Sequence, residues 1–145
     1  MATSIQGTGP HEDRTRFCRL SLVIIDKLTQ ILRDLLHDEV SPAHIFNRVV
    51  NINHLKNSLR KDQVSVISHA NTRDYQDFAI TLLYTLLRNV CQNITPPSQR
   101  WGVPTMPSPN EVAVGDDIER IRFIRNKLFG HISETTIPKT EFNDY

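Results

Sequence analysis

Three long stretches of this chain repeat apolar residues at intervals of three and four positions, which is the spacing of one face of an α-helix. They cover residues 15–38, 73–92 and 116–131. Residues 64–68 alternate between apolar and polar side chains, so a short strand is an alternative interpretation there, although a helix or a turn is favoured. We therefore predict an all-α fold, a helical bundle of four to five helices with a core built by the helices over 15–38 and 73–92.

The first helical stretch follows a polar leader. Residues 1–14 are rich in Gly, Ser, Thr and Pro, so we expect a disordered leader there and a single helical domain over residues 15–145. The chain stops soon after Phe142, and we expect it to be the N-terminal domain of a longer protein. The residues of the first stretch that we predict to face the core are Phe17, Leu20, Ile24, Leu28, Ile31, Leu32 and Leu35.

Shorter elements and one long loop are predicted between the long helices. Ser41 and Pro42 suit the N-cap and first turn of a helix, and a short helix is expected around Leu55. Residues 95–115 form a connection that holds five of the eight prolines. A loop of that length is usually functional or mobile. Trp101 is interpreted as pinning this loop to the body of the fold, with base stacking as the alternative.

The last helical stretch, Asp116–His131, carries helix signals at both ends. Its two leading aspartates suit a helix N-terminus, because carboxylates cap free N–H groups and meet the positive end of the helix dipole. Gly130 is a common residue just past a helix end. Arg125 falls within the apolar face of this helix, where an arginine is costly unless it has a partner or lines a polar cleft. The apolar face comprises Ile118, Ile121, Ile124, Leu128 and Phe129.

Arg125, Asn126 and His131 are the polar residues of this stretch that merit attention as a site. In an unbroken helix the side chains of Arg125 and His131 point about 120° apart, which is poor for joint chemistry. Gly130 loosens that constraint if it ends the helix and lets His131 swing back. The three residues are therefore expected to converge either at a helix end or with their copies from a second chain.

The run Arg125-Asn126, four further residues and His131 resembles the R-N-x(4–6)-H signature of HEPN domains. The surrounding sequence is similar to the animal HEPN subgroup named after the DAZ-interacting zinc-finger ubiquitin ligase, and the likeness runs from about residue 16 to residue 145. It implies a HEPN-like helical bundle with a long Pro-rich loop before the last long helix. The segments that carry the subgroup likeness are Asp77–Asn89, Pro96-Pro97, Trp101-Gly102, Pro104 and Asp117–Arg122.

This resemblance implies an RNA-directed domain and metal-independent endoribonuclease chemistry without a cofactor. His131 would exchange protons with the 2′-hydroxyl or the leaving oxygen, and Arg125 would bind the phosphate. Asn126 would orient the histidine or donate to a phosphate oxygen. One histidine per chain leaves a second protonating group missing, so a homodimer with both helices facing one cleft is expected. Arg122 and Lys127 are second-rank RNA contacts.

The residue types alone also fit a purely structural interpretation. An arginine near a helix C-terminus meets the dipole and the free carbonyls, and a histidine after a glycine cap is ordinary. The alternative function is therefore a catalytically inactive RNA-binding or protein-interaction module. The family resemblance implies that it would then be a dimerisation adaptor within a multidomain ubiquitin-ligase-like or innate immune protein.

Composition narrows the class of protein further. The formal net charge is +1, so no global field attracts nucleic acid, and any RNA contact must use local basic patches. No stretch approaches the roughly 18 apolar residues of a membrane span, and no hydrophobic signal core is present, which predicts a cytoplasmic protein. Cys18 and Cys91 are expected to be free buried thiols. The histidines His37, His44, His54 and His69 are scattered, so no metal site is expected.

Overall fold

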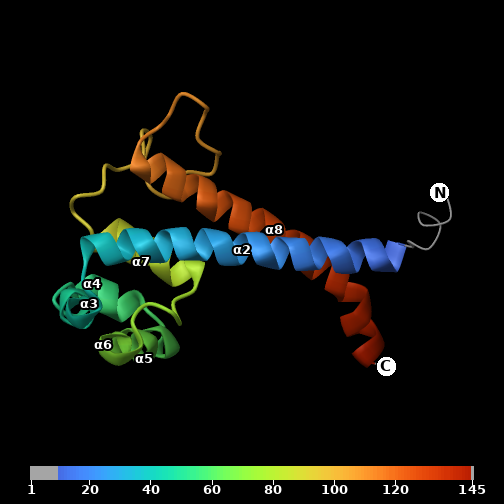
Figure 1. Cartoon of the computed structure of the whole chain (residues 1–145), viewed down its shortest axis with the longest axis horizontal. Coiled ribbons are helices and arrows are strands. Elements are labelled where there is room, and N and C mark those ends of the chain that lie inside the picture. The colour runs from blue at the N-terminus through green and yellow to red at the C-terminus, as the bar shows by residue number, and fades with distance from the viewer. Residues whose placement is uncertain (1–9, 145) are drawn as a thin grey trace. The chain divides into compact units, whose positions relative to one another are not determined.

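The computed structural model describes the backbone of residues 10–144 and the side chains of residues 11–132. Within that part of the chain it is helical throughout its regular structure and holds no strand, which confirms the all-α prediction (Figure 1). The two longest helices are α2 and α8. The helices are α2 (Pro10–Glu39), α3 (Pro42–Val50), α4 (Asn53–Ser58), α5 (Lys61–Ser68), α6 (Ala70–Arg73), α7 (Ile80–Asn89) and α8 (Val114–Asp144).

The chain divides into two compact units, and α2 and α8 each contribute to both. The central unit comprises residues 28–123, and the terminal unit comprises the described residues up to Lys27 and from Ile124 onward. Among the described residues, no helix is long and apolar enough to cross a membrane. Each unit is considered separately below.

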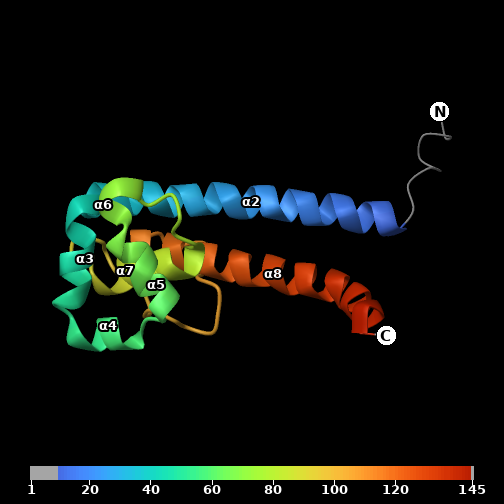
Figure 2. The same cartoon turned by 90° about the horizontal axis from the view of Figure 1, so that it is seen from below.

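The central unit is built around α7 and the C-terminal third of α2. Helix α3 contacts α4, α5 and α6, and the four helices gather beside α7 (Figure 2). Ser41 takes the extended N-cap position before Pro42, as predicted, although its side chain makes no capping hydrogen bond. The most deeply buried apolar side chains of this unit are Leu32, Leu36, Ile45, Leu55, Ile67, Tyr75, Phe78, Leu83, Leu86, Leu87 and Ile118.

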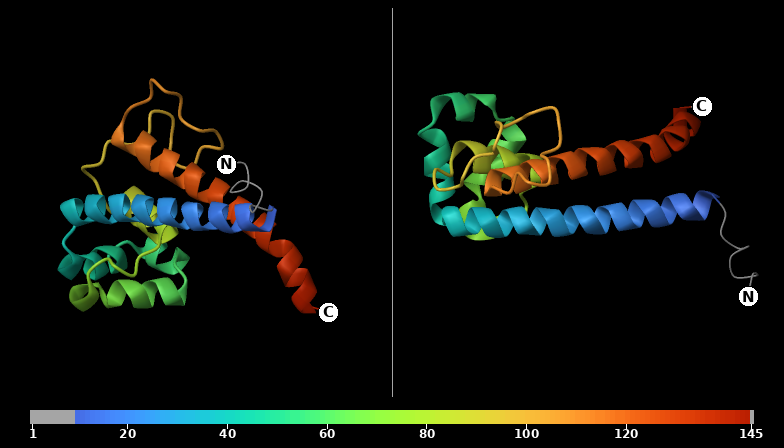
Figure 3. Two further views of the ribbon diagram at one scale, coloured as in Figure 1. Left: turned by 45° about the vertical axis from the view of Figure 1, so that its right-hand side comes forward. Right: turned by 90° about the horizontal axis from the view of Figure 1, so that it is seen from above.

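In the terminal unit, the first half of α2 and the part of α8 after Ile124 lie side by side (Figure 3). Ser21 and Ile25 are buried on α2, and the rings of Phe17 and His131 meet edge to face with centroids 5.6 Å apart. Cys91 in the central unit is a buried free thiol, as expected, whereas Cys18 in this unit is only half-buried. Burial raises the pKa of the Cys91 thiol to about 12, so it stays protonated and inert at neutral pH.

Four sequence-based expectations need correction. First, α2 begins at Pro10, so residues 10–14 of the predicted leader are helical, while residues 1–9 lie outside the described part of the chain. Second, the predicted core stripe of α2 is partly wrong, because Leu20 and Ile31 are 59% and 54% exposed. The helix instead buries a line that includes small polar side chains: Ser21, Ile25, Thr29, Leu32 and Leu36.

Third, the helix predicted over 73–92 is interrupted. Asp74 ends α6 with φ 60° and ψ −151°, a backbone conformation rare outside glycine, and α7 starts only at Ile80. Fourth, α8 continues through Gly130 to Asp144, so the helix end expected at Gly130 is wrong.

Candidate functional site

Helix α8 carries all the predicted site residues, and its N-terminus is fixed by a buried carboxylate. Asp116, 1% exposed, accepts hydrogen bonds from the backbone N–H of Ala113 (3.0 Å) and of Ser98 (2.8 Å). The Ser98 hydroxyl donates a third, at 2.6 Å. These bonds lower the pKa of Asp116, the Ser98 hydroxyl contributing most. The Asp116 side chain therefore caps α8, as its position predicted, and it also fastens the loop to the helix, which was not predicted.

The loop also approaches the first turn of α8 through its backbone. The Gly115 N–H donates to the Thr95 carbonyl at 2.9 Å. A Cβ atom at residue 115 would lie 2.3 Å from the Pro97 nitrogen, closer than real Cβ contacts come. Glycine is therefore required here by close packing rather than by a special backbone dihedral angle.

One turn further along α8, Glu119 is the centre of a buried polar cluster. Its carboxylate has no exposed surface. One oxygen, Oε2, accepts bonds from the Tyr84 hydroxyl (2.5 Å) and the Gly102 N–H (3.1 Å). The other, Oε1, accepts from Nε and Nη2 of Arg122 at 3.1 and 2.7 Å. Burial and the bond to Glu119 raise the pKa of Tyr84 to about 12, so the Tyr84 hydroxyl stays protonated and acts as a donor at neutral pH.

Arg122, predicted as an RNA contact, belongs to this cluster. Its Nη2 also donates to the Val103 carbonyl at 2.8 Å, and its guanidinium lies 4.5 Å from the Phe123 ring centroid. The side chain is only 23% exposed. Arg122 therefore joins α8 to the 101–103 loop, and its contact with RNA stays a prediction.

Sequence reasoning missed the Glu119 cluster, although the Trp101 interpretation pointed toward it. Trp101 is half-buried, and its ring meets Tyr84 of α7 edge to face at 5.9 Å, which agrees with its predicted role in pinning the loop. The available signal was the spacing of Glu119 and Arg122, which places opposite charges on one helical face. Nothing local in the sequence indicates that Tyr84 and Gly102 complete the cluster.

The predicted residues Arg125 and Asn126 are directly joined in the terminal unit. Arg125 Nη1 donates to Asn126 Oδ1 at 3.0 Å, and the guanidinium lies 4.2 Å from the Phe129 ring centroid. This cation–π contact explains how an arginine is accommodated on an apolar helix face. Arg125 is half-buried, and Asn126 and Lys127 are exposed. The other nitrogen atoms of the Arg125–Asn126 pair can still donate hydrogen bonds at the surface of α8.

His131 does not swing back toward Arg125 through a helix end. Because α8 continues through Gly130, the two side chains leave the helix about 120° apart. His131 is exposed, and its ring packs edge-on against Phe17. The proposed convergence through a break at Gly130 is therefore wrong, and convergence with residues of a second chain stays a prediction.

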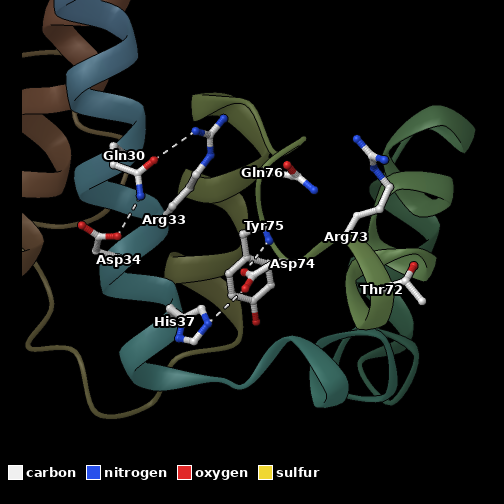
Figure 4. A pocket seen from close by; sticks show the side chains of 9 residues that line it. All are labelled: Gln30, Arg33, Asp34, His37, Thr72, Arg73, Asp74, Tyr75 and Gln76. Atoms are coloured by element: carbon white, nitrogen blue, oxygen red, sulfur yellow. Dashed lines mark hydrogen bonds and ion pairs between the residues drawn. The ribbon is translucent and has the colours of Figure 1, made fainter.

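A separate polar cavity of about 460 Å³ opens in the central unit between α2 and the segment joining α6 to α7 (Figure 4). His37 Nε2 and Asp74 Oδ2 meet across it at 3.3 Å. Asp74 Oδ1 also accepts the Tyr75 N–H at 2.6 Å, which helps to hold its unusual backbone. The lining comprises Gln30, Arg33, Asp34, His37, Thr72, Arg73, Asp74, Tyr75 and Gln76.

The charged side chains that line the cavity bond to polar groups within the central unit. Arg73 forms a two-bond pair with Asp77, and Gln30 donates to Asp34 at 2.8 Å. Arg33 donates to the Phe78 carbonyl at 3.3 Å, but its buried Nε has no partner. In the described part of the chain, no group of three or more His, Cys, Asp or Glu side chains is arranged to hold a metal ion. The cavity is best understood as a polar junction between two segments of the core.

Comparison with known proteins agrees with the resemblance drawn from the motif. A family model described as DZIP3/hRUL138-like HEPN matches residues 38–145, well over half of the chain. No curated protein and no solved structure gives a significant match. The matched range contains Arg122, Arg125, Asn126, Lys127 and His131.

Proposed function

Because the chain belongs to the DZIP3/hRUL138-like HEPN family, we propose that it is an RNA-directed domain whose Arg125, Asn126 and His131 form a metal-independent endoribonuclease site between two copies of the chain. The observation that carries the proposal is the Arg125–Asn126 pair, hydrogen-bonded at 3.0 Å in the same unit as His131. The guanidinium of Arg125 from one copy would supply an anion contact, and the surface histidine of the other copy would supply a proton-transfer group. These are the two functions that RNA cleavage needs.

The proposed reaction is a transesterification within the RNA. The His131 imidazole of one copy takes the proton of the 2′-hydroxyl, and the 2′-oxygen forms a bond to the adjacent phosphorus. The bond between phosphorus and the 5′-oxygen breaks, and the imidazolium of the second copy donates its proton to that oxygen. The products are a 2′,3′-cyclic phosphate and a 5′-hydroxyl. Arg125 binds the phosphate and stabilises the extra charge of the transition state.

Two features support a site made by two copies. Arg125 and His131 diverge on one continuous helix, so one chain alone points them at different regions of space. The terminal unit also exposes several large apolar side chains, as a surface covered in an assembly would. They are Phe17, Leu20, Leu22, Val23 and Phe129, with exposed fractions between 38% and 59%.

A second function, an inactive adaptor, is favoured by a different observation. The functional groups of Arg125 already contact Asn126 and Phe129 within α8. An arginine stabilised in this way also suits a helix that presents its apolar face to another protein. In this case the exposed apolar side chains would bind a partner domain, and the Arg–Asn–His residues would be structural.

The two functions are separated by cleavage of a mixed-sequence single-stranded RNA in EDTA. The wild type is compared with Arg125→Ala and His131→Ala, and with His44→Ala, which removes an exposed histidine of α3. Circular dichroism checks that each variant is folded. Cleavage by the wild type and His44→Ala alone, leaving cyclic-phosphate ends, supports the ribonuclease. Absence of cleavage by every protein, with assembly intact, supports the adaptor.

A further inference from the structure

A half-buried tryptophan in the central unit is held in place from two sides. Trp101 lies in the loop before α8, and its ring is nearly perpendicular to that of Tyr84, with an interplanar angle of 84°. The next two residues are bonded to the buried cluster, since Gly102 N–H donates to Glu119 and Val103 carbonyl accepts from Arg122. Gly102 adopts φ 76°, a left-handed conformation that favours glycine. The indole is therefore positioned by the fold.

Two exposed arginines lie close to this tryptophan, Arg88 through its proximity to Gly102 and Arg100 by its position in the chain. Arg88, exposed in the last turn of α7, places its Nη1 3.5 Å from the position that a Cβ on Gly102 would occupy. Arg100 precedes Trp101 in the chain and is also exposed. Among the described residues, no carboxylate forms an ion pair with either guanidinium, whereas Arg122 is paired with Glu119. One unpaired guanidinium thus lies close to the residue that follows Trp101, and a second exposed arginine directly precedes Trp101 in the chain.

We infer that Trp101, Arg88 and Arg100 form a subsite for one nucleotide of single-stranded RNA, with the base stacked on the indole and the adjoining phosphate bound by the two guanidinium groups. Stacking on an aromatic ring combined with cationic contacts to the backbone is the general chemistry of single-strand binding. The inference rests on the proposed RNA-directed function but uses none of the proposed cleavage residues. It also gives a role to Arg88. The neighbouring Asn89 has a different one, because its side chain donates to the Thr85 carbonyl at 2.8 Å.

The expected ligand preference follows from the residue types. A planar indole accepts any base, so the subsite tolerates different sequences but requires an unpaired, unstacked base. Single-stranded RNA should bind more tightly than a duplex of the same length. Binding should weaken as salt concentration rises, because the guanidinium groups displace counterions from the phosphates.

The experiment uses the intrinsic fluorescence of the protein, since Trp101 is its single tryptophan. The full chain carrying His131→Ala, which removes the proposed cleavage, is titrated with an oligouridylate of about eight nucleotides, a length within the single-strand site sizes known for other folds. We expect the emission of Trp101 to be quenched. Adding Arg88→Gln should weaken binding about fivefold or more, whereas Arg48→Gln, which neutralises an exposed arginine of α3, should leave it unchanged.

A second readout covers variants that lack the reporter. Fluorescence anisotropy of a labelled oligouridylate should give nearly wild-type affinity for Trp101→Phe and about tenfold weaker affinity for Trp101→Leu. If Trp101→Leu does not fold, the comparison of Arg88→Gln with Arg48→Gln tests the subsite instead. Unchanged Trp101 emission on RNA binding, or equal effects of Arg88→Gln and Arg48→Gln, would overturn the subsite. If the wild type cleaves RNA but Trp101 emission does not change during the titration, only the subsite proposal is rejected. If Trp101 emission is quenched but the wild type does not cleave RNA, only the ribonuclease proposal is rejected.

Discussion

Glu119 and Arg122 lie one turn apart on α8, and the fully buried carboxylate of Glu119 receives two hydrogen bonds from the Arg122 guanidinium, at 2.7 and 3.1 Å. The same carboxylate accepts the Gly102 N–H, and the same guanidinium donates to the Val103 carbonyl. The pair therefore connects the last long helix to the loop that carries Trp101. A buried charge with four donors is stable only while its partners remain.

Glu119→Gln should destabilise the fold by about 3 kcal/mol, because the neutral amide leaves the Arg122 charge uncompensated and brings an extra donor into a site built of donors. The measurement is the free energy of unfolding in urea. Asp117→Asn is the matched control, since Asp117 pairs with Arg120 at the same spacing on the same helix but is 66% exposed. That control should cost less than about 1 kcal/mol. Equal costs for the two variants would contradict a buried ion pair at Glu119.

Asp116 should make the fold sensitive to acid. Its pKa is lowered in the folded state, so its contribution to stability is present above the unfolded pKa of about 3.9 and is lost as pH falls through the folded value. In Asp116→Asn, Tm at pH 7 should be lower than in the wild type. The difference in Tm should shrink as pH falls below about 4, since the wild-type carboxylate then becomes protonated. A difference that is constant from pH 7 to pH 2.5 would contradict this role.

Substitutions at Asp74 should separate backbone strain from side-chain bonding. Asp74→Ala loses the His37 contact and the bond from the Tyr75 N–H while keeping a Cβ at φ 60°. We expect it to destabilise by about 2 kcal/mol. Asp74→Gly loses the same bonds but relieves the strain, so it should be more stable than Asp74→Ala by about 1 kcal/mol. Urea unfolding of both variants measures this difference, and equal stabilities would show that the backbone there is unstrained.

The continuity of α8 can be tested with its two glycines. A Cβ at Gly130 meets no atom within 4 Å, so Gly130→Ala should stabilise the helix by up to about 1 kcal/mol. If the helix ended there with Gly130 in a left-handed conformation, the same change would destabilise. Gly115→Ala is the contrasting variant, because its Cβ would lie 2.3 Å from the Pro97 nitrogen. It should destabilise by at least about 2 kcal/mol. Thermal unfolding followed by circular dichroism measures both.

Helical periodicity predicted most of α2 and the first half of α8, but it missed the interruption between α6 and α7 and did not show which face of α2 is buried. The apolar side chains in the first half of α2 point in all directions around the helix axis, so the apolar pattern selects no single face. They are Phe17, Leu20, Leu22, Val23 and Ile25. The face that is buried includes Ser21 and Thr29, whose small polar side chains carry little weight in a hydrophobic pattern. Burial on α2 depends on packing between distant segments, which no local pattern contains.

The candidate site on α8 was also predicted only in part. Arg125 and Asn126 are adjacent in sequence, and the structure joins them by a hydrogen bond. The position of His131 depended on Gly130, whose glycine signal is worth only about 1 kcal/mol and does not end the helix here. The Asp74 interruption was missed because an aspartate with positive φ needs support from His37, which is distant in sequence. A weak local signal therefore accounts for the error at His131, and a long-range contact accounts for the error at Asp74.

The proposed two-copy site requires that the terminal unit associate through its exposed apolar surface. Leu20 and Val23 share one face of α2 and are 59% and 52% exposed. An aspartate at either position would bury an unpaired charge in such an interface, so Leu20→Asp and Val23→Asp should convert a dimer to a monomer and abolish RNA cleavage without unfolding the chain. Sedimentation equilibrium measures the mass, and circular dichroism measures the helix content.

Val112→Asp provides the control for this experiment, because Val112 is an apolar side chain of the loop that is 76% exposed and belongs to the central unit. It should remain dimeric and active. If all three variants are dimeric, a different surface holds the copies together. If the wild type is a monomer that still cleaves RNA, the second proton-transfer group must come from the same chain, and the arrangement proposed for His131 is wrong. Because Arg125 and His131 diverge along one helix, that result would require another group of the chain to approach the RNA.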